Sequence, residues 1–355
     1  MTEQQLFELL NTITPADGAA MCAAEVRQAS LAKPPHSLGR LEDISVRLAG
    51  IFDTERPTLG RTGVLVFAAD NGVCAEGVSC TPQSVTREQA VNMTRGLTGM
   101  STLARFFGDE VIVTDVGILT DTHCPAVRDR KIRHGTEDLA VRPAMLRSEA
   151  VQAISVGIET VREAKAAGLT AVGIGEMGIG NTTTSAAVSC VLLDRAPEEM
   201  TGRGAGLSDD GLRRKIEVIY KGIAINHPEK TDVIGVLSAL GGLDIAGLCG
   251  VFLGGALEGV PILMDGFISS VAALCAVRLC PAAAKAVFAS HVSAEPAAHM
   301  VLDALGKAPL ITANLHLGEG TGAVASIPLW DMALAVYRGC YSFAEGGIAS
   351  YTPQC

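Results

Sequence analysis

Short apolar runs that end in Asp, Asn or Gly recur along the chain, and segments with helical spacing separate them. Alternation of buried strands with helices is typical of a parallel sheet covered on both faces. The sequence therefore predicts an α/β fold with a Rossmann-like, doubly wound, mostly parallel sheet. The expected strands are residues 63–69 (GVLVFAA), 110–114 (EVIVT), 170–174 and 261–264, with further candidates at 284–290 and 310–313.

The remaining segments show helical rather than strand patterns. Thr2 opens a possible capping box, Thr14 followed by Pro15 resembles a helix start, and Ser37 could cap a third helix that ends at Ile51. The other expected helices are residues 84–95, 101–107, 148–167, 182–193, 208–225, 232–240, 243–257, a segment ending at 279, and 321–341. We expect residues 1–58 to form a small helical domain, joined by the C-terminal helix at about 321–355. Residues 59–320 then form a large α/β domain that binds nucleotide and base.

Charge and hydropathy exclude two broad classes of partner. The formal net charge is −10 and no cluster of Lys and Arg occurs, so no nucleic-acid partner is expected and small-molecule chemistry fits better. Residues 231–289 are strongly apolar, but Asp and Glu side chains divide them into pieces too short to cross a membrane. These interrupting acids are Asp232, Asp244, Glu258 and Asp265.

The ten cysteines contain no CxxC pair, and the first residues carry no signal-peptide pattern. We therefore expect reduced thiols and a cytoplasmic protein. His123, Cys124 and His134 are close in sequence, but their spacing matches no standard ligand pattern, so no metal site is expected.

The strongest local motif is residues 173–183 (GIGEMGIGNTT), between an expected strand and an expected helix. Glycine at 175, 178 and 180 lets the backbone approach a ligand, and the helix start at Asn181 and Thr182 supplies free amide groups and a partial positive charge. That combination predicts a phosphate site formed by Gly175, Gly178, Gly180, Asn181 and Thr182. The alternative is a tight turn that needs glycine only for packing.

The type of phosphate follows from what this motif lacks. Residues 173–178 match the dinucleotide pattern GxGxxG, but that pattern normally follows the first strand of the fold. Residues 175–182 resemble a triphosphate-binding loop, except that Asn181 replaces the required lysine. A phosphomonoester is the ligand that remains.

Residues 316–322 (HLGEGTG) form the second motif. Glycines on both sides leave Glu319 unshielded, which is suited to a general base, although an acid at a helix start could also simply complement the helix dipole. Glu176, inside the first motif, would repel a phosphate unless it faced ribose hydroxyls. Lys215 lies in the middle of a helix, where charge alone favours a solvated position.

Six segments together resemble the nicotinate-nucleotide–dimethylbenzimidazole phosphoribosyltransferase family along essentially the whole chain. They are residues 35–42 (PHSLGRLE), 67–73 (FAADNGV) with 76–79 (EGVS), 173–183, 264–266 (MDG), 291–296 (HVSAEP) and 316–322. The resemblance implies transfer of a 5-phosphoribosyl group from nicotinate mononucleotide to 5,6-dimethylbenzimidazole, with inversion at the anomeric carbon. The products are nicotinate and the α-ribazole 5′-phosphate of the cobalamin lower ligand. The resemblance also implies that the protein is a homodimer and needs no cofactor.

The resemblance also implies roles for single residues. Glu319 is the general base, Glu176 lies near the ribose and the base pocket, and Lys215 lies near the nucleotide. The mononucleotide also contacts Asp265, Gly266 and Ser293. The benzimidazole pocket is expected around Ser79, Gln89, Met177 and Leu317.

Two other functions remain open at this stage. An NAD-dependent oxidoreductase would bind a dinucleotide through the GxGxxG match. A non-catalytic sensor of a nucleotide or benzimidazole would bind without turnover. Release of nicotinate in the presence of a benzimidazole distinguishes a transferase from both.

Overall fold

The computed structural model describes residues 1–350 and contains one six-stranded parallel sheet. The spatial strand order is β3-β2-β1-β4-β5-β6, and every neighbouring pair is parallel, which confirms the predicted fold class. In this topology the chain reverses direction across the sheet between β1 and β4, so ligands bind beyond the carboxyl ends of these strands. The strands are β1 Arg61–Ala69, β2 Glu110–Gly117, β3 Val127–Asp129, β4 Leu169–Met177, β5 Ile262–Met264 and β6 Val287–Ala289.

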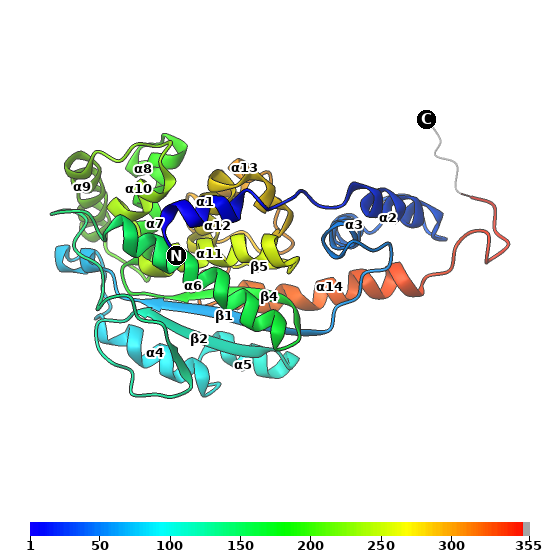
Figure 1. The fold of residues 1–355 in the computed structure, drawn as a ribbon, viewed down its shortest axis with the longest axis horizontal. Helices are drawn as coiled ribbons and strands as arrows, with labels where there is room; N and C mark the ends of the chain where they lie inside the picture. The colour runs from blue at the N-terminus through cyan, green and yellow to red at the C-terminus, as the bar shows by residue number, and fades with distance from the viewer. Residues whose placement is uncertain (351–355) are drawn as a thin grey trace.

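Helices cover both faces of the sheet (Figure 1). One face contacts α11 (Leu243–Glu258) and α12 (Phe267–Leu279), with α6 (Arg147–Ala166) and α7 (Asn181–Leu193) packed around them. The other face contacts α4 (Ser84–Thr94), α5 (Gly99–Phe107) and α14 (Thr321–Gly339). The remaining helices are α8 Pro197–Met200, α9 Asp209–Asn226, α10 Val233–Leu240, α13 Ala298–Ala304 and the short 3₁₀ helices Gly72–Glu76 and Pro281–Lys285.

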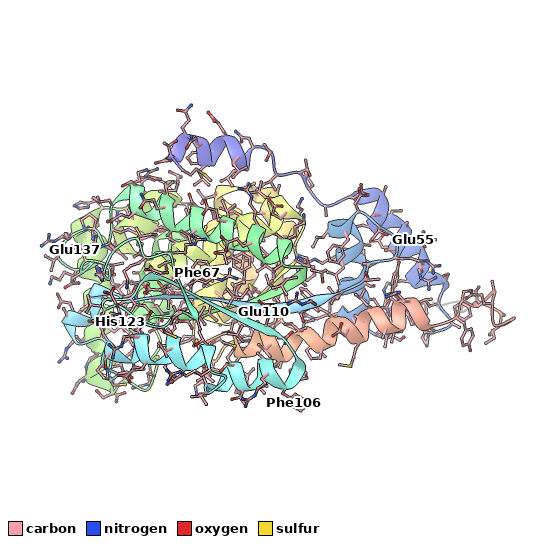
Figure 2. The ribbon with its side chains drawn as sticks, turned by 60° about the horizontal axis from the view of Figure 1, so that its bottom comes forward. Glu55, Phe67, Phe106, Glu110, His123 and Glu137 are labelled. Carbon is pink, nitrogen blue, oxygen red and sulfur yellow. The ribbon has the colours of Figure 1, made fainter. Side chains whose placement is uncertain are left out.

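Alternating side chains of β1 show why the sheet is buried on both sides. Leu65 and Phe67 belong to the core beneath α11, while Val64 and Val66 belong to the core beneath α4 and α5. Figure 2 shows Phe67 inside the molecule and Phe106 of α5 at its outer edge. The helices above the sheet can pack closely because they are rich in glycine. A Cβ atom at Gly157 of α6 would lie 2.0 Å from the carbonyl oxygen of Gly247 in α11.

Segments from the N-terminal and C-terminal parts of the chain pack together beside the sheet. Helix α2 (Gly18–Ser30) and helix α3 (Arg40–Phe52) pack with the last turns of α14, where Tyr337 is fully buried. After these helices the main chains pair: the Ala32 N–H donates to the Tyr341 carbonyl at 2.9 Å, and the Phe343 N–H donates to the Ser30 carbonyl at 3.0 Å. Helix α1 (Glu3–Leu10) instead packs on α6 and contributes to the main core.

Several predicted boundaries are wrong. The strand expected at 170–174 continues to Met177, so the turn that was expected at 175–181 is limited to residues 178–180. Residues 310–313 form no strand, because only one bridge, between His291 and Ile311, forms there. The sequence analysis also missed β3, whose three residues are too few to show a strand pattern.

The N-terminal caps differ from the prediction in two of three cases. Thr2 does form the expected capping box. The second helix is capped by Asp17, whose carboxylate accepts the Ala20 N–H at 2.6 Å, rather than by Thr14. Ser37 caps nothing, since α3 begins at Arg40 after a left-handed Gly39. Across residues 1–350, none of the helices combines the length and the apolar character needed to cross a membrane.

Candidate active site

A cavity of about 290 Å³ lies beyond the carboxyl ends of β1, β4, β5 and β6. The loop before α14 and the loop before α9 complete its walls. The cavity therefore brings together two motifs, residues 173–183 and residues 316–322, that are far apart in sequence. Of the residues predicted for the site, those lining it are Ser79, Gln89, Glu176, Met177, Gly178, Gly180, Asn181, Thr182, Lys215, Asp265, Gly266, Ser293, Leu317 and Glu319.

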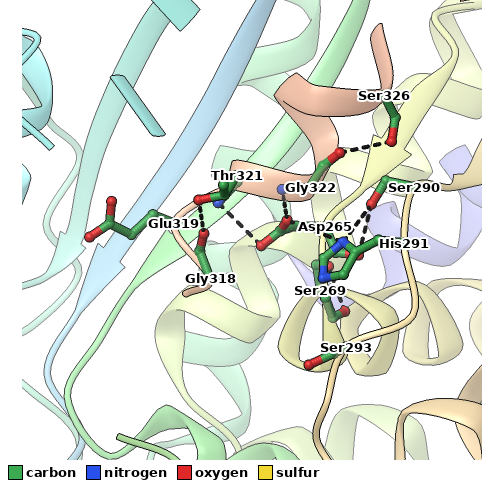
Figure 3. A network of polar contacts seen from close by, with 12 residues as sticks. Asp265, Ser269, Ser290, His291, Ser293, Gly318, Glu319, Thr321, Gly322 and Ser326 are labelled. Carbon is green, nitrogen blue, oxygen red and sulfur yellow. Dashed lines mark hydrogen bonds and ion pairs between the residues drawn. The ribbon is translucent and has the colours of Figure 1, made fainter. Parts of the chain in front are cut away.

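Glu319 is held in an unusual backbone conformation. Gly318, Glu319 and Gly320 all have positive φ, at 78°, 64° and 102°, and only glycine adopts such angles without strain. Buried Asp265 fixes the loop: its Oδ2 accepts the Gly320 N–H at 3.2 Å and its Oδ1 accepts the Gly322 N–H at 2.7 Å. Figure 3 shows this carboxylate beneath the first turn of α14, with the Glu319 side chain pointing away from it. Asp265 thus positions the loop that carries Glu319.

Two glycines allow this loop to lie against the sheet. Gly175, predicted as a phosphate ligand, does not line the cavity. It lies in β4, and a Cβ atom there would be 2.0 Å from the Glu319 carbonyl oxygen. At Gly322 a Cβ atom would lie 1.8 Å from Nδ1 of His291. The structure therefore gives Gly175 a packing role, which was the alternative explanation for the glycines of this motif.

The Glu319 carboxylate is buried and only partly hydrogen-bonded. Its Oε1 accepts a hydrogen bond from Nε2 of Gln89 at 3.2 Å, and its Oε2 has no hydrogen-bond partner among residues 1–350. Burial raises the pKa of this carboxyl group, although the nearby Thr98 hydroxyl, the Met100 N–H and Gln89 act in the opposite direction. Leu317, which is 57% exposed, and Met177 line the same cavity. A buried carboxylate in a cavity that is also lined by apolar side chains can accept a proton from the ring nitrogen of an aromatic base.

Glu176 is the second-last residue of β4, and its side chain lies near the carboxylates of Asp244 and Asp265. Its carboxylate accepts a hydrogen bond from Nδ2 of Asn181, which also donates to Oδ2 of Asp244 at 3.0 Å. Burial is the main reason that the pKa of Glu176 rises to about 8 and that of Asp244 to about 6, and in the case of Glu176 the neighbouring carboxylates add to the shift. A cation bound here would favour the ionised forms.

Lys215 contributes a cation to the same cavity. It belongs to α9 and is 1% exposed, so the solvated position suggested by charge alone is wrong. Its ammonium group donates to the Thr182 hydroxyl at 2.8 Å and to the Gly202 carbonyl at 3.2 Å, and no carboxylate of residues 1–350 lies within 4 Å of it. Burial lowers its pKa to about 8, although the nearby charge of Glu295 acts in the opposite direction. Together with the start of α7 after Gly180, this unpaired ammonium suits a phosphate group.

The sequence analysis missed the importance of Asp244 and of two side chains around Asp265. Asp244 was used only as a charge that interrupts an apolar stretch, although the Gly241-Gly242 pair before it marks a helix start at the edge of the sheet. Buried His291 lies 3.8 Å from Asp265 and 3.1 Å from the Ser290 hydroxyl, and burial lowers its pKa. Glu295 also lines the cavity. Within residues 1–350, no group of three or more His, Cys, Asp or Glu side chains is arranged to hold a metal ion.

Comparison with known proteins identifies the family. A family model described as phosphoribosyltransferase matches residues 13–348. A nicotinate-nucleotide–dimethylbenzimidazole phosphoribosyltransferase of Acetivibrio thermocellus is 46% identical over 98% of this chain and 99% of its own length, and one from Chloroflexus aggregans is 44% identical over 97% and 98%. A crystal structure of CobT from Thermus thermophilus superimposes with a TM-score of 0.90 at 40% identity, covering 94% of this chain and all of that one. The chain therefore belongs to the nicotinate-nucleotide–dimethylbenzimidazole phosphoribosyltransferase family.

Proposed function

We propose that the chain transfers the 5-phosphoribosyl group of nicotinate mononucleotide to 5,6-dimethylbenzimidazole, forming α-ribazole 5′-phosphate for the lower ligand of cobalamin. One observation carries this proposal: a single cavity is lined by the Lys215 ammonium group, which lies beside a helix start and forms no ion pair within residues 1–350, and by the buried Glu319 carboxylate. The first feature suits the donor phosphate, and the second suits an aromatic acceptor that must lose a proton.

The donor binds with its phosphate at the start of α7. Thr182 and Lys215 hold the phosphate, while Asp265, Gly266 and Ser293 lie on the mononucleotide side of the cavity. In the unliganded protein the raised pKa of Glu176 keeps it mostly protonated near neutral pH. The cationic pyridinium of the donor, and then the positive charge that develops at the anomeric carbon, favour the ionised carboxylate. We therefore expect donor binding to release a proton.

The acceptor binds near Ser79, Gln89, Met177 and Leu317. The lone pair of its unprotonated ring nitrogen attacks the anomeric carbon from the face opposite nicotinate, which inverts the configuration. The bond to the pyridinium nitrogen breaks, and its electron pair leaves with nicotinate as a neutral ring nitrogen, so the leaving group needs no acid. The second ring nitrogen of the new benzimidazolium then gives its proton to Glu319. General-base catalysis of this kind contributes about 10²–10⁴-fold, and positioning of the two substrates supplies most of the remainder.

Specific observations weigh against an oxidoreductase. The glycine-rich turn follows β4 rather than β1, where the dinucleotide pattern belongs. Asp115 on β2 could otherwise bind a ribose. Its Oδ2 forms an ion pair with Nζ of Lys131 at 2.9 Å, and its Oδ1 accepts hydrogen bonds from the Gly117 and Ile118 N–H groups.

The decisive experiment incubates the purified protein with nicotinate mononucleotide and 5,6-dimethylbenzimidazole and follows both nicotinate and α-ribazole 5′-phosphate by chromatography. We expect the two products in equal amounts, and we expect Glu319→Ala to bind both substrates but turn over slowly. Binding of both substrates without any nicotinate release would instead identify a sensor.

We also propose a homodimer, a cytoplasmic location, and a small helical domain formed by both chain ends beside the large α/β domain. Exposed apolar side chains on and near α5, including Leu97 and Phe106, support an interface between copies of the chain. All nine cysteines within residues 1–350 are free thiols, which is consistent with a reducing compartment. Light scattering coupled to size exclusion tests the dimer.

A further inference from the structure

One of the six segments that carry the family resemblance lies away from the candidate active site. Residues 35–42 contribute Pro35, His36, Arg40 and Glu42 to a second cavity, of about 720 Å³, and none of them lines the first. This cavity lies between α2 and α3 on one side and β6 with residues 306–310 on the other. Its volume is within the range of small-molecule sites.

Arg47 of α3 lines this cavity as a cation without a carboxylate partner. Its guanidinium carbon lies 3.7 Å from the centre of the Phe288 ring, and its Nη2 donates to the Val287 carbonyl at 2.5 Å. No ion pair to Arg47 forms within residues 1–350. Burial lowers its pKa to about 10, even though the nearby charge of Asp43 acts in the opposite direction. Stacking on Phe288 fixes the plane of the guanidinium group, and within residues 1–350 its Nε and Nη1 form no hydrogen bond.

Lys307 is a second cation in the same cavity. Its ammonium group donates to the Ala284 carbonyl at 3.0 Å and forms no ion pair with any residue of 1–350. Burial, and then the positive charge of Arg47, lower its pKa to about 7. The two cations are therefore close enough to repel each other, and both are partly removed from water. Such a pair is unfavourable unless an anion compensates it.

The acids that line the cavity do not supply this compensation. Oε1 of Glu42 already forms an ion pair with Nζ of Lys33, at 2.7 Å. Glu25 and Asp43 are exposed, and neither forms an ion pair with Arg47 or Lys307. The buried part of the cavity is therefore cationic, and its exposed edge carries mixed charges.

We propose that this cavity is a second anion site, in which Arg47 and Lys307 bind a phosphate-type oxyanion. The planar guanidinium can donate two parallel hydrogen bonds to such an anion, and the ammonium adds a point charge. The volume leaves room for a larger body attached to the oxyanion, such as a nucleoside monophosphate. The argument for this site does not use the proposed transferase reaction, so either proposal can fail without the other.

Fluorescence of a tryptophan near this site can report anion binding. Trp330 is the only tryptophan, is fully buried, and has its ring 4.7 Å from the ring of Phe288, on which Arg47 stacks. The probe is sulfate, added to the full-length protein at constant ionic strength with sodium chloride as reference. We expect a saturable change in Trp330 emission with sulfate and none with chloride.

Two variants test which cavity produces the change in Trp330 emission. In Lys307→Met the sulfate affinity is expected to fall at least about tenfold, because a hydrogen bond to a charged group is lost. Lys215→Met, which removes the cation of the first cavity, is the matched control and is expected to keep the response. Adenosine monophosphate forms a second arm: binding tighter than that of sulfate shows that the rest of the cavity is used, and equal binding limits the ligand to the oxyanion.

Three results would overturn the proposal. One is a Trp330 signal that does not respond to sulfate. Another is a response that survives in Lys307→Met but disappears in Lys215→Met, which would place the anion in the first cavity. The third is a sulfate response that appears only on dilution, which would show that a second copy of the chain covers the cavity.

Discussion

Adding a single methyl group to β4, by Gly175→Ala, is expected to displace the proposed base without removing any charge. The new Cβ atom would lie 2.0 Å from the Glu319 carbonyl oxygen and 2.5 Å from its carbonyl carbon. Restoring an ordinary contact of 3.4 Å requires the loop to move by about 1.4 Å. Because both obstructing atoms belong to the backbone, no rotamer change can relieve the clash. A misplacement of about 1 Å in a catalytic group can reduce the rate about 10²-fold, and we expect a loss of that order in kcat.

The assay measures kcat from nicotinate release and donor affinity by calorimetry. Donor affinity is expected to stay within a few fold, because the phosphate side of the cavity lies at α7 and α9. Gly173→Ala is the matched control on the same face of the same strand: its Cβ would lie 2.9 Å from the Ala323 methyl group, so restoring an ordinary contact of 3.4 Å requires α14 to move by only about 0.5 Å. Equal kcat values for the two variants, or wild-type kcat in Gly175→Ala, would refute the link between this contact and the position of Glu319.

Three further predictions concern charged groups of the cavity. Glu319→Gln is expected to lower kcat about 10²–10⁴-fold and to abolish the fall in wild-type rate at low pH, a fall that begins at higher pH than for an exposed glutamate because burial raises the pKa of Glu319; pH–rate profiles test this. The pKa of Glu176 rises from 4.5 to about 8 on folding, so between these pH values the carboxyl group is protonated in the folded state but ionised in the unfolded state. The free energy of unfolding therefore falls progressively as pH rises through this window. The stability of Glu176→Gln relative to wild type should increase across that window in urea unfolding, and a constant difference would contradict the shift. Lys215→Met is expected to weaken nicotinate mononucleotide binding about 10–100-fold, and unchanged affinity would exclude Lys215 from the phosphate site.

The location of the site could be predicted because it depends on topology. Once strands and helices alternate, the carboxyl ends of parallel strands must share one edge, so the polar residues after each strand converge there. Asp265 and the 178–180 turn are placed in this way. The local pattern, however, could not distinguish a glycine needed for a turn from one needed for close packing, which is why Gly175 was assigned to the phosphate.

Burial of charged residues was the main property that local sequence could not supply. Lys215 looks like a solvated helix residue, and the packing of α9 against α7 and residues 202–204 buries it; its place near the nucleotide was implied by the family resemblance alone. Asp244 likewise acquires its role from Asn181, which is distant in sequence. The second cavity depends on contacts between α3 and residues near 307, and nothing in the spacing of Arg47 and Lys307 indicates that they meet.

The pairing of residues 30–32 with residues 341–343 has a consequence for how the protein is made on the ribosome. Since these two segments are far apart in sequence, their hydrogen bonds cannot form until residues 341–343 have left the exit tunnel. Helix α14, which begins directly after Gly320, also leaves the exit tunnel later than all six strands. The sheet can collapse early around β1 and β4, but the carboxylate proposed as the base reaches its place only once the loop before α14 has left the ribosome and packed on Asp265, so products truncated before residue 316 should fold in part and remain inactive.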